Sequence, residues 1–289
     1  MFVKENTVSA IKEYFFNSLK DLYPKLEVES FFHILCDYFL GYSRVQVAMS
    51  LDKTMSESEL LKFHYAIKDL KKFKPVQFIT GTQFFYDNEF KVTEHTLIPR
   101  PETEELVDLI VKDNADLKGS ILDIGTGSGA IAISLDKALV NSSVTAFDVS
   151  KDALETAKVN NLAISSNVDF QYQDILKPSY NGEAFEIIVS NPPYVLESEK
   201  ELMQANVLDY EPHLALFVED SDPLFFYKSI IEFCKLHLVS GGKLYFEINE
   251  KYGAETAKLL SDNNFSEIEV IKDMQGKDRM VKGIKNKTT

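Results

Sequence analysis

Hydrophobic residues in the first quarter of the chain recur at three- and four-residue steps. Such spacing places apolar side chains on one face of an α-helix, so it predicts several helices between residues 7 and 73. Pro75 follows the cationic segment 71–74, as is typical where a helix stops. We therefore expect a helical domain over residues 1–74. The residues at the helical spacing are Ile11, Phe15, Leu19, Leu22, Phe31, Leu35, Tyr38, Phe39, Leu60, Phe63, Ile67 and Leu70.

The pattern changes after Pro75. β-Branched and aromatic residues around Gly81 and residues 87–88 predict a short strand followed by a hairpin between residues 76 and 96. The prolines at 99 and 101 then interrupt the chain before a helix of about a dozen residues that begins near Thr103, since acidic residues follow it and suit the positive end of a helix dipole. Residues 75–102 are thus expected to form a β-hairpin connector.

From residue 103 onward, short apolar runs alternate with helical stretches, which predicts a parallel sheet covered by helices on both faces. The last two strands are separated only by residues 272–278, too few for a crossover helix, so the last strand should pair antiparallel. The expected fold class for 103–289 is a Rossmann-like α/β sheet of seven strands with an antiparallel last strand. The strands are expected at 120–125, 144–149, 168–173, 185–190, 243–248, 265–271 and 279–284, and the helices near 129–139, 151–163, 223–238 and 251–263.

The net charge of −14 is unevenly distributed: residues 1–74 hold 11 Lys and Arg against 10 Asp and Glu, and residues 75–289 hold 20 against 35. A protein that grips nucleic acid normally presents a basic face, so this balance argues against direct nucleic-acid binding and permits a basic protein partner. No apolar run approaches the roughly 20 residues that cross a bilayer, and the start lacks the layout of a secretory signal. We expect a cytoplasmic protein that does not bind membranes. The two cysteines and five scattered histidines lack ligand spacing, so no metal is expected.

Three successive strand ends carry residues suited to a nucleoside cofactor. The first strand runs into Gly125-Thr126-Gly127-Ser128-Gly129, a glycine turn in which a ligand can approach the backbone. Asp148 ends the second strand, where its carboxylate can accept hydrogen bonds from both ribose hydroxyls. After the third strand, Asp174 can accept from an adenine amino group and Ile175 can lie against the ring. Nicotinamide, flavin and S-adenosylmethionine cofactors all share this nucleoside.

The fourth strand ends in Asn191-Pro192-Pro193-Tyr194, which can position an amide as a methyl acceptor. The lone pair of a primary amide nitrogen is delocalised into the carbonyl, so the nitrogen must be oriented by acceptors for its two N–H groups. The Asn191 side-chain oxygen and the Pro192 carbonyl can supply them, and neither proline offers a competing N–H. Tyr194 can lay an aromatic face on a planar amide or base.

Together these segments resemble class I S-adenosylmethionine-dependent methyltransferases, whose sheet ends in an antiparallel strand. More narrowly, the chain resembles the peptide chain release factor glutamine methyltransferases, the HemK/PrmC family. The resemblance covers nearly the whole length, through residues 75–81, 97–104, 123–133, 189–194, 211–212 with 215–216, and 272–279. Asp87 and the segment 247–252 depart from the usual family pattern, and the second departure concerns only details near the fifth strand.

This resemblance implies an enzyme that uses S-adenosyl-L-methionine to methylate the side-chain amide of the glutamine in the Gly-Gly-Gln loop of class 1 release factors. It implies that residues 1–74 recognise the substrate and that residues 125–129, Asp148, Asp174, Ile175 and Asn191 bind the cofactor. It implies that Asn191, Pro192 and Tyr194 are catalytic. It also implies that the whole segment Asn191–Tyr194 binds the substrate amide. Arg100 and Glu102 either line the substrate pocket or are structural. We expect a monomer.

Three other interpretations remain at this stage. An adenine-N6 methyltransferase faces the same geometric problem with an exocyclic amino group, although the net charge opposes a nucleic-acid substrate. A non-catalytic binding module could keep the fold, but the intact glycine turn, Asp148 and Asn191 argue for catalysis. A nicotinamide dehydrogenase would need a third fingerprint glycine where Ala130 stands.

Overall fold

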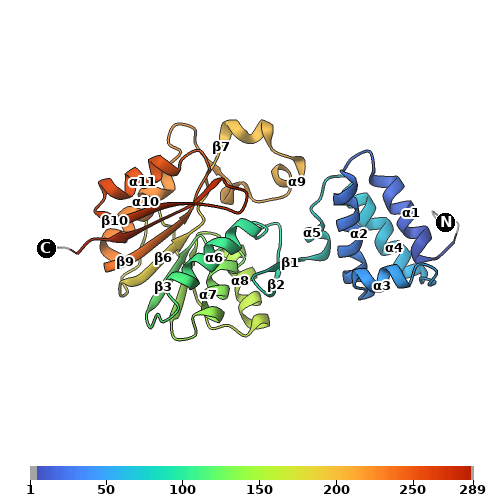
Figure 1. Cartoon of the computed structure of the whole chain (residues 1–289), viewed down its shortest axis with the longest axis horizontal. Helices are drawn as coiled ribbons and strands as arrows, with labels where there is room; N and C mark the ends of the chain where they lie inside the picture. The colour runs from blue at the N-terminus through green and yellow to red at the C-terminus, as the bar shows by residue number, and fades with distance from the viewer. Residues whose placement is uncertain (1–4, 288–289) are drawn as a thin grey trace. The chain divides into compact units, whose positions relative to one another are not determined.

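The computed structural model describes residues 5–287, and its contacts divide the chain into two units. The first contains the chain up to Gly81 together with Gln204–Tyr210. It is built from α1 (Val8–Leu19), α2 (Lys25–Leu40), α3 (Arg44–Met49), α4 (Glu57–Leu70), α5 (Val76–Thr80) and the short α9 (Ala205–Leu208) (Figure 1). The second contains the rest, Thr82–Met203 and Glu211 onward.

The helices of the first unit follow from their sequence. Side chains at three- and four-residue steps, such as Ile11, Phe15 and Leu19 of α1, are fully buried in one apolar cluster. At α4 the Ser56 hydroxyl accepts from the Glu59 N–H while the Glu59 carboxylate accepts from the Ser56 N–H, which satisfies two donors at the helix start. The expected helical character of this region is therefore present.

The strand expected at the start of the connector is wrong, because Val76–Thr80 forms the helix α5. Pro75 precedes its first residue and Gly81 ends it with a φ of 76°, so one turn is closed at both ends by backbone geometry. The expected hairpin follows as β1 (Thr82–Phe85) and β2 (Asn88–Lys91), which pair antiparallel.

The second unit is a seven-stranded sheet with the order β10-β11-β9-β6-β3-β4-β5. Its strands are β3 (Ser120–Ile124), β4 (Ser143–Asp148), β5 (Asp169–Tyr172), β6 (Phe185–Ser190), β9 (Leu238–Glu247), β10 (Phe265–Lys272) and β11 (Asp278–Lys285). Every pairing is parallel except those of β11, which lies antiparallel to both β9 and β10. The α/β fold class with an antiparallel last strand is confirmed.

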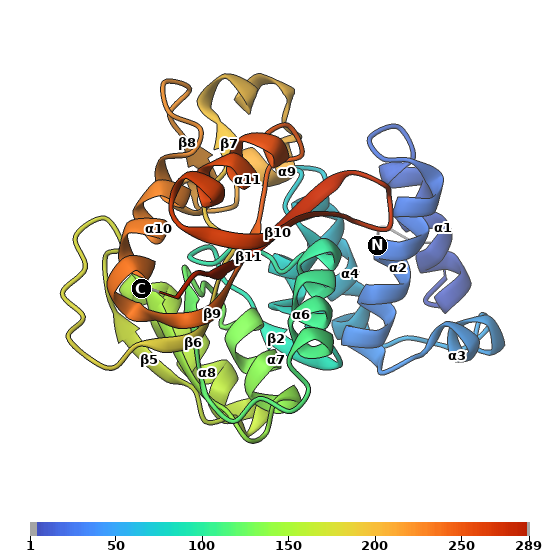
Figure 2. The same ribbon diagram turned by 60° about the vertical axis from the view of Figure 1, so that its left-hand side comes forward.

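Helices cover both faces of this sheet, as Figures 1 and 2 show. On one face lie α6 (Pro101–Asp113), α7 (Ala130–Ala138) and α8 (Lys151–Ile164), whose apolar residues share a core with β3, β4 and β6. On the other lie α10 (Phe225–His237) and α11 (Gly253–Asp262), packed against Leu122, Ile188 and Phe246. Because both faces are buried at the centre of the sheet, β3 and β6 are largely apolar.

The segment between β6 and α10 was not assigned elements from the sequence. It holds β7 (Val195–Leu196) and β8 (Phe217–Val218), which pair parallel, and the 3-10 turns η1 (Glu197–Leu202) and η2 (His213–Ala215). These pieces follow directly after the Asn191–Tyr194 segment and border it. Across residues 5–287, no helix has the length and apolar character needed to span a membrane.

Candidate functional site

A cavity of about 340 Å³ lies where β3, β4, β5 and β6 end. The parallel pairing of these strands brings their carboxyl ends to one edge of the sheet, where open α/β sheets bind ligands. The volume lies in the range of small-molecule sites. The lining residues are His95, Thr96, Leu97, Ile124, Gly125, Gly127, Phe147, Asp148, Val149, Ser150, Ala153, Gln173, Asp174, Ile175, Leu176, Ser190, Asn191, Pro192, Pro193, Pro212, Leu214, Ala215, Phe226 and Ile230.

The glycine turn leaves open space toward this cavity. Gly125, Gly127 and Gly129 have φ values of 78°, 56° and 84°, a left-handed backbone that side chains rarely adopt. A Cβ on Gly125 or Gly127 would meet no atom within 4 Å, so the space beside these two residues fits a ligand. At Gly129 a Cβ would lie 2.9 Å from the Ile133 side chain, so this glycine is required for packing.

Asp148 connects the turn to the second strand. Its Oδ2 accepts from the Gly127 N–H at 2.8 Å, and its Oδ1 accepts from the Ser150 N–H at 2.8 Å. Burial raises the pKa of this carboxyl, while the two backbone hydrogen bonds oppose the rise. Each carboxylate oxygen can accept a second hydrogen bond, so Asp148 can serve both the loop and a hydroxyl-bearing ligand in the cavity.

Asp123 lies directly before Ile124 at the end of β3 and is fully buried. Neither carboxylate oxygen has a hydrogen bond of normal geometry to another described residue. Burial raises the pKa of Asp123 to about 7, and the negative charge of Asp148 adds to the rise. The nearby Thr126 hydroxyl and Ala132 N–H lower the pKa in part. Asp123 therefore lies beneath the turn without lining the cavity.

The third strand contributes Asp174 and Ile175 to the lining. The Asp174 carboxylate accepts from the Leu176 N–H at 2.9 Å, which closes the turn after β5. Ile175 is partly buried against the apolar cluster of the second face. The glycine turn, Asp148, Asp174 and Asn191 are thus brought together around one cavity.

The segment after β6 places Asn191, Pro192 and Pro193 in the lining, whereas Tyr194 points elsewhere. The Tyr194 hydroxyl donates to Oε1 of Glu247 at 3.0 Å. Burial and then the negative charge of Glu247 raise the pKa of Tyr194, so the phenol stays neutral. The Ser190 hydroxyl donates to the Ile124 carbonyl at 2.7 Å and ties the two strand ends together.

Several sequence-predicted residues do not line the cavity: Arg100, Glu102, Thr126, Ser128, Gly129 and Tyr194. Arg100 forms an ion pair with Glu211, which is 4% exposed and also accepts from the Ile98 N–H at 3.1 Å. This pairing ties the segment before α6 to the one before η2. The Ser128 carbonyl accepts from the Asn160 amide at 2.8 Å, so Ser128 helps hold α8.

Other lining residues were not identified from the sequence. His95–Leu97 lie between β2 and α6, and Pro212, Leu214 and Ala215 lie around η2. Pro212 and Ala215 belong to the family resemblance, which is a signal for these two residues, whereas Leu214 has none. Phe226 and Ile230 of α10 are apolar helix positions that no local pattern distinguishes from the core.

Family models match two parts of the chain. The model described as PrmC N-terminal domain matches residues 16–81, and the model described as Methyltransferase small domain matches residues 102–214. Among solved structures, a methyltransferase from Pyrococcus furiosus aligns with a TM-score of 0.51 and 21% identity, covering 68% of this chain and 89% of that one. That likeness supports the fold alone.

Curated relatives match almost from end to end. The release factor glutamine methyltransferase of Bacteroides thetaiotaomicron is 46% identical over 275 residues, covering 95% of this chain and 99% of its own. That of Flavobacterium psychrophilum is 46% identical over 279 residues, covering 94% and 98%. That of Bacillus subtilis is 39% identical over 255 residues, covering 86% and 88%. The resemblance predicted from the motifs is confirmed, and the chain belongs to the release factor glutamine methyltransferase family.

Proposed function

We propose that this protein is a methyltransferase that modifies the side-chain amide nitrogen of the glutamine in the Gly-Gly-Gln loop of class 1 release factors. The observation that carries the proposal is the position of Asn191 and Pro192 in a cavity that also contains the glycine turn and Asp148. A group that can hold an amide and groups suited to a nucleoside therefore line one cavity.

The residues present fit S-adenosyl-L-methionine. The open space beside Gly125 and Gly127 admits a ligand against the backbone, and Asp148 keeps acceptor capacity for ribose hydroxyls. We assign Asp174 and Ile175 to the adenine and Asn191 to the edge of the cofactor site. When bound, the cofactor supplies an electrophilic methyl group on a sulfonium.

Asn191 and Pro192 act by holding the acceptor amide. The side-chain oxygen of Asn191 and the carbonyl of Pro192 accept the two amide N–H bonds, which directs the nitrogen lone pair along one line. Neither Pro192 nor Pro193 has a backbone N–H, so no donor there can bind the amide oxygen and reverse its orientation. Pro192 is buried and the Tyr194 hydroxyl is bound to Glu247, so this segment is rigid.

The protein partner is a release factor, with the helical unit as its recognition domain. An acidic second domain suits a basic protein surface, and we expect a cytoplasmic monomer without direct nucleic-acid contact. The rival adenine-N6 activity uses the same amide-like geometry but requires the enzyme to grip nucleic acid, which the charge of −14 opposes.

The test is to incubate the protein with methyl-labelled S-adenosyl-L-methionine and purified release factor, with and without DNA, and to map the label by mass spectrometry. We expect label on the glutamine of the Gly-Gly-Gln loop. Asn191→Ala should reduce the rate by at least about 100-fold, since misplacement of a reacting group costs this much. The matched control is Asn263→Ala, at an asparagine whose amide only caps α11. Label on DNA and none on the factor would reverse the assignment.

A further inference from the structure

A buried hydrogen-bond chain leads from Glu247 at the end of β9 to the amide of Asn191. Glu247 is 1% exposed. Its Oε2 accepts from the Thr103 hydroxyl at 2.7 Å and its Oε1 from the Tyr194 hydroxyl at 3.0 Å. The Thr103 oxygen in turn accepts from Nδ2 of Asn191 at 3.4 Å. Thr103, Tyr194 and Glu247 lie outside the cavity lining, so this chain reaches the cavity through Asn191.

The chemistry of these groups fixes the direction of each hydrogen bond. A carboxylate is only an acceptor, and a hydroxyl has one proton to donate and two lone pairs. Thr103 therefore donates its only proton to Glu247 and can offer Asn191 nothing but an acceptor. The NH₂ group of Asn191 must face Thr103, which turns its carbonyl oxygen away. That oxygen accepts no hydrogen bond from any other residue between 5 and 287.

The turn between β10 and β11 supplies positive charge to this chain. Arg279 donates through Nε to Oδ2 of Asp273 at 3.1 Å, and Oδ1 of the same carboxylate accepts from the N–H groups of Gln275 and Lys277. Burial raises the pKa of Glu247, while the hydrogen bonds from Thr103 and Tyr194 and the charge of Arg279 oppose the rise. The Asp273 side chain is itself buried, so Arg279 is held in place.

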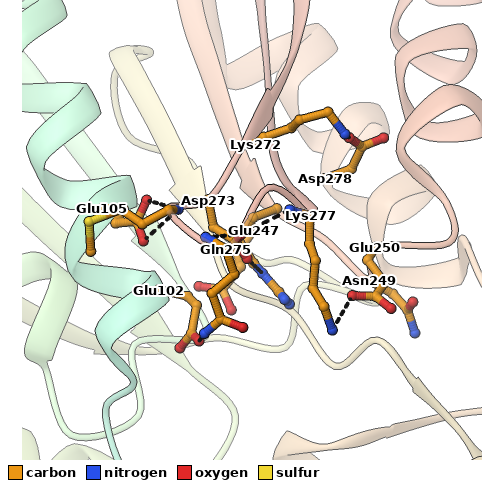
Figure 3. A network of polar contacts seen from close by, with 12 residues as sticks. Glu102, Glu105, Glu247, Asn249, Glu250, Lys272, Asp273, Gln275, Lys277 and Asp278 are labelled. Atoms are coloured by element: carbon orange, nitrogen blue, oxygen red, sulfur yellow. Dashed lines mark hydrogen bonds and ion pairs between the residues drawn. The ribbon is translucent and has the colours of Figure 1, made fainter.

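The same turn is attached to the helix that carries Thr103. The Met274 N–H donates to the Glu105 carboxylate at 3.2 Å, and the Gln275 amide donates to Glu102 at 3.4 Å. Figure 3 shows Glu102 and Glu105 of α6 reaching the turn, with Glu247 behind it. The motif 272–279 thus links α6, β9 and β11 around Glu247.

We propose that Thr103 and Glu247 are positioning residues that hold the Asn191 amide with its oxygen toward the substrate. In this orientation the site accepts a hydrogen bond from a neutral carboxamide and repels a carboxylate, so the pair determines selection of glutamine over glutamate. The assignment of the substrate side chain rests on the proposed function. The direction of the Asn191 amide does not.

The central variant is Thr103→Val, which keeps the shape of threonine and removes the hydroxyl. Thr103→Ser restores the hydroxyl, and Glu247→Gln replaces the acceptor by a group that can also donate. The matched control is Thr256→Val, at a fully buried threonine of α11 whose hydroxyl has no hydrogen-bond partner among residues 5–287. Thermal unfolding of all four variants identifies any loss of folding.

The first readout is the binding of release factor carrying either glutamine or glutamate in the Gly-Gly-Gln loop. Wild-type enzyme should bind the glutamine form more tightly, and Thr103→Val and Glu247→Gln should narrow this preference by about tenfold, since one hydrogen bond to the acceptor is lost or reversed. In the valine variant kcat should fall by about ten- to 100-fold. Thr103→Ser should recover most of both effects, and Thr256→Val should match wild type.

A second readout needs no substrate. In a side-chain amide NMR spectrum, the Asn191 signals, assigned by their loss in Asn191→Ala, should shift in Thr103→Val and return in Thr103→Ser. Unchanged Asn191 signals together with an unchanged glutamine-to-glutamate preference would overturn the inference, as would a loss of kcat with the preference intact. A wild-type enzyme that leaves the factor unlabelled refutes the proposed function instead, and the NMR series then still decides the orientation of Asn191.

Discussion

Replacing the buried Asp123 by asparagine should change how stability depends on pH. The carboxyl is fully buried beneath the glycine turn, and burial raises its pKa from 3.8 to about 7. An unfolded chain ionises this group near its ordinary pKa, whereas the folded protein keeps it protonated up to about pH 7. The folded state therefore carries an extra cost at neutral pH.

The sign and size follow from this difference. A raised pKa in the folded state means that the stability contribution is complete below about pH 4 and is lost as the pH rises toward 7. A rise of about three pH units corresponds to about 4 kcal/mol. Asp123→Asn removes the ionisable group. The free energy of unfolding of the variant relative to that of wild type should therefore rise steadily between pH 4 and 7 and stay constant above pH 7.

The assay is urea denaturation of wild type and Asp123→Asn from pH 4 to 8, without cofactor. Asp116→Asn, at an exposed aspartate after α6, is the matched control. The difference in free energy of unfolding between Asp123→Asn and wild type should move by several kcal/mol across this range. A difference that stays constant from pH 4 to 8 would refute the reasoning, because it would mean that the carboxyl titrates alike in both states.

Two further predictions concern the two units separately. Gly127→Val places a side chain in the open space beside the turn, at a φ of 56°. Calorimetry should show a cofactor affinity at least about tenfold weaker, and the strained backbone should cost about 1–2 kcal/mol of stability. An unchanged affinity would contradict the cofactor assignment. Phe32→Ala removes a fully buried ring that lies 5.5 Å from Phe15 and 5.8 Å from Phe63, so denaturation should show a loss of about 3–5 kcal/mol in the helical unit. Cofactor affinity should stay within about twofold, because every cavity-lining residue belongs to the other unit; a large loss would contradict that separation.

Much of the sheet could be predicted because its strands are short apolar runs bounded by polar turns. The expected strand at 185–190 matches β6, that at 120–125 is one residue longer than β3, and that at 144–149 is shifted by one residue from β4. β9 begins at Leu238, earlier than expected, because its pairing with β6 passes through a register irregularity around the glycines at 241–242. Local patterns could not reveal the two-residue strands β7 and β8, which exist only because Val195 pairs with Phe217, 22 positions later in the chain.

Some residues of the candidate site could likewise be predicted from the sequence, and others could not. The glycine turn, Asp148 and Asn191 could be proposed from the sequence because each ends a strand, and parallel strand ends must meet at one edge. The contact between Thr103 and Glu247 joins residues 144 positions apart, and neither residue carries a local signal of that role. The sequence showed only that the segment around 247 departs from the family pattern, which concerns its neighbours more than Glu247 itself.

The place of β11 in the sheet has a consequence for biosynthesis. β11 follows every other strand in chain order, yet it lies between β10 and β9 rather than at an edge. While the chain is being made, β9 therefore presents a long unpaired flank, and Glu247 lacks the positive charge of Arg279 until β11 arrives. A nascent chain that ends before residue 278 lacks β11, so completion of the sheet must wait for the strand that is made last.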